Sequence, residues 1–460
     1  MDTLPNEIRD KILFLSSRYW SADSSNFLNS MLVCRSWYQS VMWSAPKFLA
    51  VAVGEAEQWV FVPILRIIKR HYKNDFPRRL EDSLQAVVAW RWTFNVMVNL
   101  LLEWAANSTT TLSPIPLLAA AQYGHRYLMQ KLLERNDVAA DSRSDYGRTP
   151  LSYAAANGNK EIVDLLLRRD DVLADSRDDI GRTPLTYAAA GDCKQIVEQL
   201  LGRDDVLADS RDYFGRTPFS YAAEYGQNMA LWLLMEREDV AADSRDDVGR
   251  TPLSYAAEKG SWSGLYLLRR EDVAADSRDD VGRTPLSYAA KNGRENVVRQ
   301  LLEWDVSADS RDSSGRTPLS YAAGKSSGVT LCLLEREDVA ADSRDDVGRT
   351  PLSYAAENGR ERAVRQLLER EDVAADSRDD VGRTPLSYAA ENGHERVVRQ
   401  LLEWDVSADS RDSSGRTPLS YAAEKGSGTA LALLERNNVV ADLQDNTGRT
   451  PLSYAKETKR

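Results

Sequence analysis

The sequence predicts an all-α protein: a solenoid of short helix pairs joined by β-hairpin-like loops, preceded by a small helical domain. The first observation is that the motif Gly-Arg-Thr-Pro returns every 33 or 34 residues. The second is that each copy contains its own signals for starting and ending a helix. The third is that the N-terminal quarter of the chain lacks the motif. A fixed period of this length is typical of a solenoid with one supersecondary unit per repeat.

The repeated motif defines an array of ten copies. Their glycines are Gly147, Gly181, Gly215, Gly249, Gly282, Gly315, Gly348, Gly382, Gly415 and Gly448. The last copy reads only "LSYAKETKR" after its Thr-Pro, so it can supply one helix, and we expect it to cap the stack. A degenerate copy, "SPIPLLAAAQYGHRYLMQKLLERND", precedes the first clear one. We therefore assign residues 113–460 to about ten repeats, the last one truncated.

The structure of one repeat follows from its residues. Gly147 can adopt the positive φ that a tight turn requires. Thr149 can cap a helix with its hydroxyl, and Pro150 then takes the first helical position, where no N–H is needed. Gly158 ends this first helix, and "KEIVDLLLRR" forms the second. The residues expected to face the core are Leu151, Ala154, Ala155, Ile162, Val163, Leu166 and Leu167. The polar stretch "DDVLADSRDDIG" then returns as an extended loop or hairpin.

These residues resemble the ankyrin repeat, in which a Gly, Thr-Pro-Leu, two alanines, a Gly and a Val-x-x-Leu-Leu helix recur every 33 residues. The family usually has His after Thr-Pro-Leu, where this chain has Ser152, whose hydroxyl can still bond neighbouring backbone. The glycine that ends the first helix is replaced by Asp192 in one copy and by Ser326 in another. We expect these two turns to be strained or reshaped.

Part of the array has been copied as a block. Residues 282–323 and 382–423 match almost letter for letter, at an offset of 100 positions. Because one repeat cannot bury its apolar face alone, an added copy extends the shared core and does not disrupt it.

The first fifty residues follow a different pattern. "LPNEIRDKILFL" and "FLNSMLVCRSWYQSVMW" are amphipathic segments that resemble an F-box, with Leu-Pro-x-Glu-Ile followed by Val-Cys-Arg-x-Trp. The resemblance implies that residues 1–50 form a helical domain that docks on the Skp-family adaptor of cullin–RING ubiquitin ligases. The implied contact residues are Leu4, Pro5, Ile8, Ile12, Val33, Cys34 and Trp37. The stretch "SSRYWSADSSNF" between the two segments is longer than in the family. The alternative is that these helices only cap the first repeat.

Residues 51–112 are expected to form a helical linker. Within it, "AVVAWRWTFNVMVNLLLEW" aligns loosely with a repeat, which suggests a degenerate capping unit.

Composition narrows the possible functions. The net charge of −11 argues against nucleic acid as the partner. The first residues do not resemble a signal peptide, and no apolar stretch is long enough to span a membrane. Three distant cysteines favour a reducing compartment, so we expect the protein to be in the cytoplasm, the nucleus or both. We also expect it to be a monomer. The only histidines, His71, His125 and His394, share no spacing. We therefore expect no enzymatic activity, catalytic residue, metal or cofactor.

In the ankyrin family, the loop tips and the exposed ends of the first helices line the binding groove. Here these positions include the Arg after each motif Gly, which could form a ladder facing acidic tips, or else be paired within the protein. The early repeats add aromatic residues, which could anchor a target or fill gaps between loops. The predicted target-binding residues, drawn from 144–226, are Tyr146, Arg148, Ile180, Arg182, Tyr213, Phe214, Arg216 and Tyr225.

The sequence thus predicts a protein-interaction adaptor, the substrate-recognition subunit of an SCF-type ubiquitin ligase, that binds an unknown target protein on its repeats. The alternative is a plain ankyrin scaffold or sequestering protein.

Overall fold

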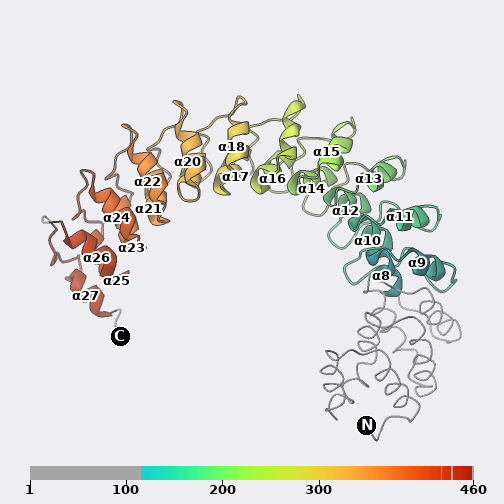
Figure 1. Ribbon diagram of the computed structural model, residues 1–460, viewed down its shortest axis with the longest axis horizontal. Helices are drawn as coiled ribbons and strands as arrows, with labels where there is room; N and C mark the ends of the chain where they lie inside the picture. The colour runs from blue at the N-terminus through green and yellow to red at the C-terminus, as the bar shows by residue number, and fades with distance from the viewer. Residues whose placement is uncertain (1–114, 426, 437–438, 458–460) are drawn as a thin grey trace, which may run out of the picture. The chain divides into compact units, whose positions relative to one another are not determined.

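The computed structural model describes residues 115–425, 427–436 and 439–457 (Figure 1). They fall into two compact units, which divide between Leu207 and Ala208. The expected domains at 1–50 and 51–112 lie outside the described residues. Both units are built from pairs of short helices.

The N-terminal unit holds three helix pairs in its described part. They are α8 (Ile115–Tyr123) with α9 (Arg126–Leu133), α10 (Pro150–Ala156) with α11 (Lys160–Leu167), and α12 (Pro184–Ala190) with α13 (Lys194–Leu201). The first helices α8, α10 and α12 pack against one another in sequence, and so do α9, α11 and α13. The first pair confirms that the degenerate copy forms a repeat.

The C-terminal unit continues the same pattern. Its first helices are α14 (Pro218–Tyr225), α16 (Pro252–Lys259), α17 (Pro285–Lys291), α19 (Pro318–Ala323), α21 (Pro351–Glu357), α23 (Pro385–Glu391), α25 (Pro418–Lys425) and α27 (Pro451–Glu457). Its second helices are α15 (Asn228–Met235), η2 (Ser263–Arg269), α18 (Glu295–Leu301), α20 (Ser327–Leu334), α22 (Glu361–Leu368), α24 (Glu395–Leu402) and α26 (Ser427–Leu434). The two sets form two rows within this unit (Figure 1). The first row ends with α27, which no second helix follows in the described residues.

The predicted helix starts are confirmed. In each first helix from α10 to α23, a Thr side chain caps the N-terminus by accepting the N–H three residues later, and Pro takes the first helical position. In α12 the side chain of Thr186, which stands where most copies have Ser, bonds the N–H of Thr183 in return. The hydroxyl that replaces the family's usual His therefore does bond neighbouring backbone.

The core lies between the two rows, where the predicted stripe is buried. Leu151, Ala154 and Ala155 of α10 are fully buried, and the alanines let neighbouring helices approach closely. Ile162, Val163 and Leu166 of α11 are buried as well, each contributing roughly 1.5–3 kcal/mol. Leu167, the last residue of α11, is only half-buried, so its predicted place in the core is wrong.

The two turns without glycine differ from the others, as expected. The glycine in this turn commonly has a positive φ, as at Gly158 (φ +70°). Asp192 keeps this geometry at φ +52° and is the one non-glycine residue in the described ranges with a positive φ, a position that strains a side chain. Ser326 instead adopts φ −144°, and its hydroxyl caps α20 by accepting the N–H of Val329. The first turn is strained and the second is reshaped.

One second helix departs from the expected α-helix. Residues Ser263–Arg269 form a 3-10 helix, η2, although runs of this length are uncommon. Between the two alanines of the first helix and the Leu-Leu of the second, the repeats with η2 and α20 have one residue fewer than the repeats with α18, α22 and α24. The α20 repeat shortens its turn at Ser326, whereas the η2 repeat keeps Gly260 at φ +82°. A 3-10 helix rises about 2.0 Å per residue against about 1.5 Å, so η2 spans the same distance with fewer residues.

The loops are hairpin-like turns, and no strand is present in the described ranges. Their tips are joined from one repeat to the next by single backbone hydrogen bonds. In the C-terminal unit the N–H of Asp247 donates to Phe214 O at 3.0 Å, and that of Asp280 donates to Val248 O at 3.1 Å. These bonds hold successive tips in a row.

Candidate protein-binding surface

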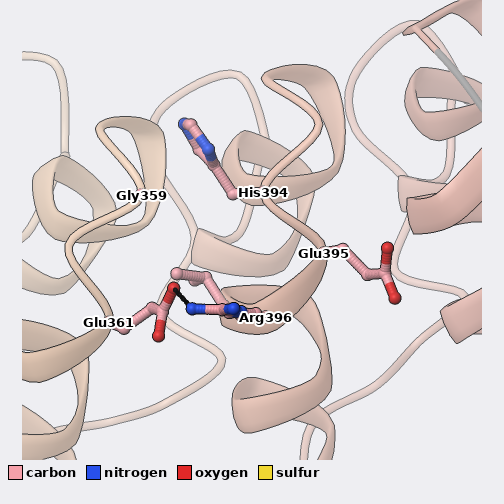
Figure 2. Close-up of a pocket in the computed structure, with 6 residues that line it drawn as sticks. Gly359, Glu361, His394, Glu395 and Arg396 are labelled. Carbon is pink, nitrogen blue, oxygen red and sulfur yellow. Dashed lines mark hydrogen bonds and ion pairs between the residues drawn. The ribbon is translucent and has the colours of Figure 1, made fainter.

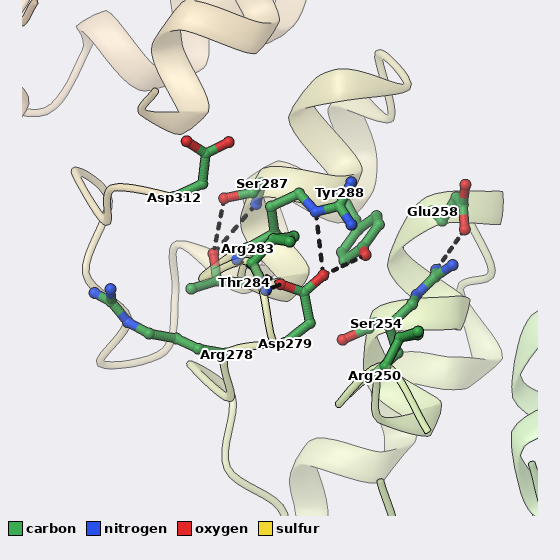
Figure 3. Close-up of polar contacts among 12 residues, drawn as sticks. Arg250, Ser254, Glu258, Arg278, Asp279, Arg283, Thr284, Ser287, Tyr288 and Asp312 are labelled. Carbon is green, nitrogen blue, oxygen red and sulfur yellow. Dashed lines mark hydrogen bonds and ion pairs between the residues drawn. The ribbon is translucent and has the colours of Figure 1, made fainter. Parts of the chain in front are cut away.

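Each loop tip from Gly181 onward is built around one aspartate, whereas Ser144 takes this place in the first tip. Asp246 Oδ1 accepts the backbone N–H groups of Val248 (3.0 Å) and Arg250 (2.8 Å), which closes the turn around Gly249 at φ +77°. Its other oxygen accepts the hydroxyl of Tyr255 at 2.5 Å. Burial, and the hydrogen bond that it donates to Asp246, raise the pKa of the Tyr255 hydroxyl. The same arrangement recurs along the chain, and Figure 3 shows it around Asp279 and Tyr288.

In most repeats the arginine after the tip glycine is stacked between tyrosine rings of consecutive repeats, whereas Arg283 and Arg316 contact the ring of their own repeat only. Arg250 lies 3.9 Å from the Tyr255 ring centroid in its own repeat and 4.1 Å from that of Tyr288 in the next. It also forms an ion pair with Glu258, at the end of its own first helix (Figure 3). Stacked cations of this kind contribute about 0.5–2 kcal/mol each. The tyrosines and arginines form an alternating ladder that couples adjacent repeats.

The predicted arginine ladder therefore exists, but most of its arginines pair with carboxylates of the protein, the alternative weighed above. Arg216 lies between Tyr221 and Tyr255, pairs with Glu224, and has only 16% of its side chain exposed. In the N-terminal unit, Arg148 lies 4.0 Å from each of two tyrosine rings, and Arg182 bonds Asp178 at 3.1 Å. Target binding by these three arginines remains a prediction.

The predicted aromatic residues are exposed. Tyr146 at its tip is 75% exposed, while Ile180 at the next tip is half-buried; both lie in the N-terminal unit, where Asp179 N bonds Tyr146 O. In the C-terminal unit, Tyr213 and Phe214 share a tip and are 65% and 59% exposed. Tyr225, the last residue of α14 in the same repeat, is 57% exposed. Their large exposed area suits interface anchors, but nothing in the structure tests whether they bind a target.

A second row of aspartates lies below the tips. These residues, the first Asp of each "DSRD", are half-buried and bond the next repeat, as Asp276 Oδ2 does by accepting the N–H of Ser307 at 3.4 Å. Burial raises the pKa of the Asp276 carboxyl, and it raises that of Asp175 to about 6. Among the described residues, no group of three or more His, Cys, Asp or Glu side chains could hold a metal ion.

A small pocket of about 320 Å³ lies at the start of α24 (Figure 2). It is lined by Gly359, Glu361, His394, Glu395, Arg396 and Val397. His394 Nε2 lies 2.9 Å from Glu357 O, and Arg396 contacts Glu361 at 3.5 Å, so these polar groups hold adjacent repeats together. No helix in the described ranges is both long and apolar enough to cross a bilayer.

Two features of this surface were missed by sequence reasoning. The tyrosines of the ladder were not singled out, although a Tyr recurs five residues after each motif Arg, as Tyr255 follows Arg250. The Arg of each "DSRD" was also overlooked; Arg278, for example, is exposed and reaches the carbonyl of Arg311 in the next loop at 3.2 Å. The predicted adaptor contact, from Leu4 to Trp37, lies outside the described residues.

Comparison with known proteins agrees with this architecture. The family described as ankyrin repeats (3 copies) matches residues 88–176, 117–209, 171–244, 254–341 and 324–412. These matches cover well over half of the chain, which therefore belongs to the ankyrin-repeat family. Proteins of this family are generally non-catalytic interaction modules, and the array is a scaffold for binding other proteins. No curated protein matches the chain.

Proposed function

We propose that this chain is a non-catalytic adaptor that serves as the substrate-recognition subunit of an SCF-type cullin–RING ubiquitin ligase. The repeats hold a target protein, and residues 1–50 dock on a Skp-family adaptor. The mechanism is proximity, because tethering raises the local concentration of target lysines near a charged E2 enzyme. The chain itself supplies no catalytic group.

One observation supports the proposed role in binding proteins: the loop tips form a row. Each tip from Gly181 onward is closed by its own aspartate, and successive tips in the C-terminal unit are bonded to one another, so exposed side chains such as Phe214 and Val248 stand on a fixed backbone. A preorganised surface loses little entropy on binding. In the target contact we include Tyr146, Tyr213, Phe214 and Tyr225.

The ligase role rests on sequence alone, on the strings "LPNEI" and "VCRSW". In this proposal Leu4, Pro5, Ile8, Ile12, Val33, Cys34 and Trp37 contact the adaptor. The protein acts as a monomer in the cytoplasm, the nucleus or both, where such ligases work.

A second candidate is a plain scaffold or sequestering protein, in which the N-terminal helices only cap the solenoid. The family match favours it, because that match is to ankyrin repeats and begins at residue 88.

Reciprocal variants of the full chain separate the two candidates by co-precipitation with a recombinant Skp-family adaptor. We expect Leu4→Ala with Trp37→Ala to abolish adaptor capture, because both remove apolar side chains from the proposed contact, while other bound proteins are retained. Tyr213→Ala with Phe214→Ala should do the reverse and serves as the matched control. If the unaltered chain fails to capture the adaptor, the scaffold alternative holds.

A further inference from the structure

Repeats of the C-terminal unit differ in charge at one position, the first residue after the two alanines of the first helix. Most carry glutamate there: Glu224, Glu258, Glu357, Glu391 and Glu424. Each of these carboxylates pairs with the ladder arginine of its own repeat. In the two consecutive repeats over 282–325 the position is taken by Lys291 and Gly324. These two repeats lack the acidic partner.

Their ladder arginines are correspondingly more exposed. The side chains of Arg283 and Arg316 are 26% and 35% exposed, against 14–19% in the repeats that carry glutamate. Arg283 contacts Asp279 through Nε at 3.1 Å (Figure 3), and Arg316 contacts Asp312 through Nε at 3.5 Å. The terminal nitrogens of both guanidinium groups therefore remain for a ligand.

Four further cations lie in or next to the same two repeats. Arg278 and Arg311 are exposed, and each donates one N–H to a backbone carbonyl of the next loop, at 3.2 Å and 2.8 Å. Lys291 and Lys325, at the ends of the two first helices, are exposed as well. Within the described part of the chain, no carboxylate lies within ion-pair distance of these four side chains. We define the basic patch as Arg278, Arg283, Lys291, Arg311, Arg316 and Lys325.

The carboxylates near the basic patch are mostly engaged. Asp279 and Asp312 accept the hydroxyls of ladder tyrosines at 2.6 Å and 2.5 Å. Asp276 and Asp309 are half-buried, and burial raises the pKa of both carboxyls. Asp280 is exposed, but the next tip carries Ser313 and Ser314 where four of the ten tips have Asp-Val. Residues 278–325 contain eight basic and seven acidic residues, in a chain whose net charge is −11.

We propose that the basic patch binds an acidic, extended peptide segment of the target protein, with an acidic residue at every third position. This inference rests on the proposed binding role of the repeats. Charge complementarity selects the acidic segment, and each guanidinium fork can donate two N–H groups to one carboxylate. The spacing follows from the solenoid, because packed helices lie about 8–10 Å apart, and three residues of polyproline II helix rise about 9 Å.

The duplicated block supplies an internal comparison. Residues 282–323 and 382–423 differ at three positions, and one of them is Lys291 against Glu391. Gly324 corresponds in the same way to Glu424. In the second copy Glu391 pairs with Arg383, and Glu424 pairs with Arg416 at 2.7 Å. The two copies therefore repeat the same motif, but the first copy has a lysine and a glycine where the second has two glutamates.

The test uses fluorescence anisotropy of labelled peptides with the full chain. The probe repeats the triplet Glu-Pro-Ala, and its control has the same residues with the glutamates in one block. We expect the triplet peptide to bind more tightly, and Lys291→Glu with Gly324→Glu to weaken it about tenfold or more, since the new carboxylates occupy both arginines. The control variant Arg362→Gln, Arg365→Gln, Arg396→Gln makes the same charge change on exposed second-helix positions and should bind normally.

The reciprocal variant, Glu391→Lys with Glu424→Gly, should create a second peptide site of similar affinity. It keeps the inference testable if the first variant folds poorly, which urea unfolding would detect. Equal binding of the blocked peptide or of single-stranded DNA would overturn the proposal, as would unchanged affinity in the Lys291→Glu, Gly324→Glu variant. Adaptor capture by the same variants is measured in parallel. If peptide binding fails while adaptor capture persists, only this inference is lost.

Discussion

At the scale of single residues, the ladder tyrosine has the most influence on the structure. Its ring supports the arginines of two repeats, and its hydroxyl bonds the aspartate that closes the tip, as Tyr288 does with Asp279 at 2.6 Å. One side chain therefore links the first helix, the loop and the neighbouring repeat.

Replacing Tyr288 with Phe separates these roles, because the ring stays and the hydroxyl is lost. We expect the free energy of unfolding to fall by about 1–2 kcal/mol, since a buried hydrogen bond to a charged acceptor is removed. The measurement is urea denaturation followed by circular dichroism. Tyr225→Phe, at an exposed position, is the control and should change stability by less than about 0.5 kcal/mol. Equal effects at both sites would contradict the role given to the hydroxyl.

Residue roles in the repeats could be predicted where local chemistry decides them. The Thr caps, the Pro starts and the strained Asp192 all follow from backbone preferences. The pairing of the arginines could not be chosen from the sequence, because both alternatives use the same residues. Only the positions of Tyr255 and Glu258 around Arg250 show that its charge is engaged.

At the scale of elements, the turns tolerate change better than the helices that they join. The turn between the two helices of a repeat contains a glycine in most copies, Asp192 at φ +52° in one copy, and Ser326 in extended geometry in another. Where a residue is missing and the turn keeps its glycine, the second helix tightens into η2. Sequence periodicity predicts that a helix exists here but not its type, because 3-10 and α-helices bury similar apolar patterns.

Gly393 allows the cost of a positive φ to be measured alone. Its φ is +73°, and a Cβ added there would meet no atom within 4 Å. We expect Gly393→Ala to lower the free energy of unfolding by about 1–2 kcal/mol, from backbone strain without a clash. Gly393→Asn is the control and should cost less, because Asn tolerates the left-handed region. An Ala variant as stable as the unaltered chain in urea would show that this turn relaxes.

At the scale of the whole molecule, stability is built from contacts between neighbouring repeats. In both units each first helix packs on the next one, and in the C-terminal unit the ladder links successive repeats as Arg250 links Tyr255 to Tyr288. The sequence could predict this architecture because every repeat restates the same pattern. It could not predict which charged side chains pair with one another, because pairing depends on distances such as the one that joins Arg250 to Glu258.

Because every ladder tyrosine carries the same ionisable hydroxyl, the stability of the fold should decrease steeply at alkaline pH. Burial and the hydrogen bond to aspartate raise the pKa of the ladder tyrosines, and that of Tyr321 rises to about 12 from an ordinary 10.0. The same direction holds for Tyr187, Tyr255, Tyr288, Tyr354, Tyr388, Tyr421 and Tyr454. A raised pKa in the folded state means that the protonated hydroxyl stabilises the fold.

This stabilisation is complete below pH 10.0, the pKa of an ordinary tyrosine, and is lost as pH rises toward 12. We expect the urea midpoint to be independent of tyrosine ionisation near neutral pH and to fall steeply over that window, because several tyrosines titrate together. Ultraviolet absorbance of tyrosinate, recorded with circular dichroism, supplies the control: the buried hydroxyls should ionise only as the helices unfold. Full ionisation of the tyrosines in a still-folded chain would contradict the linkage, since the ladder would then be shown to stand without its hydroxyl bonds.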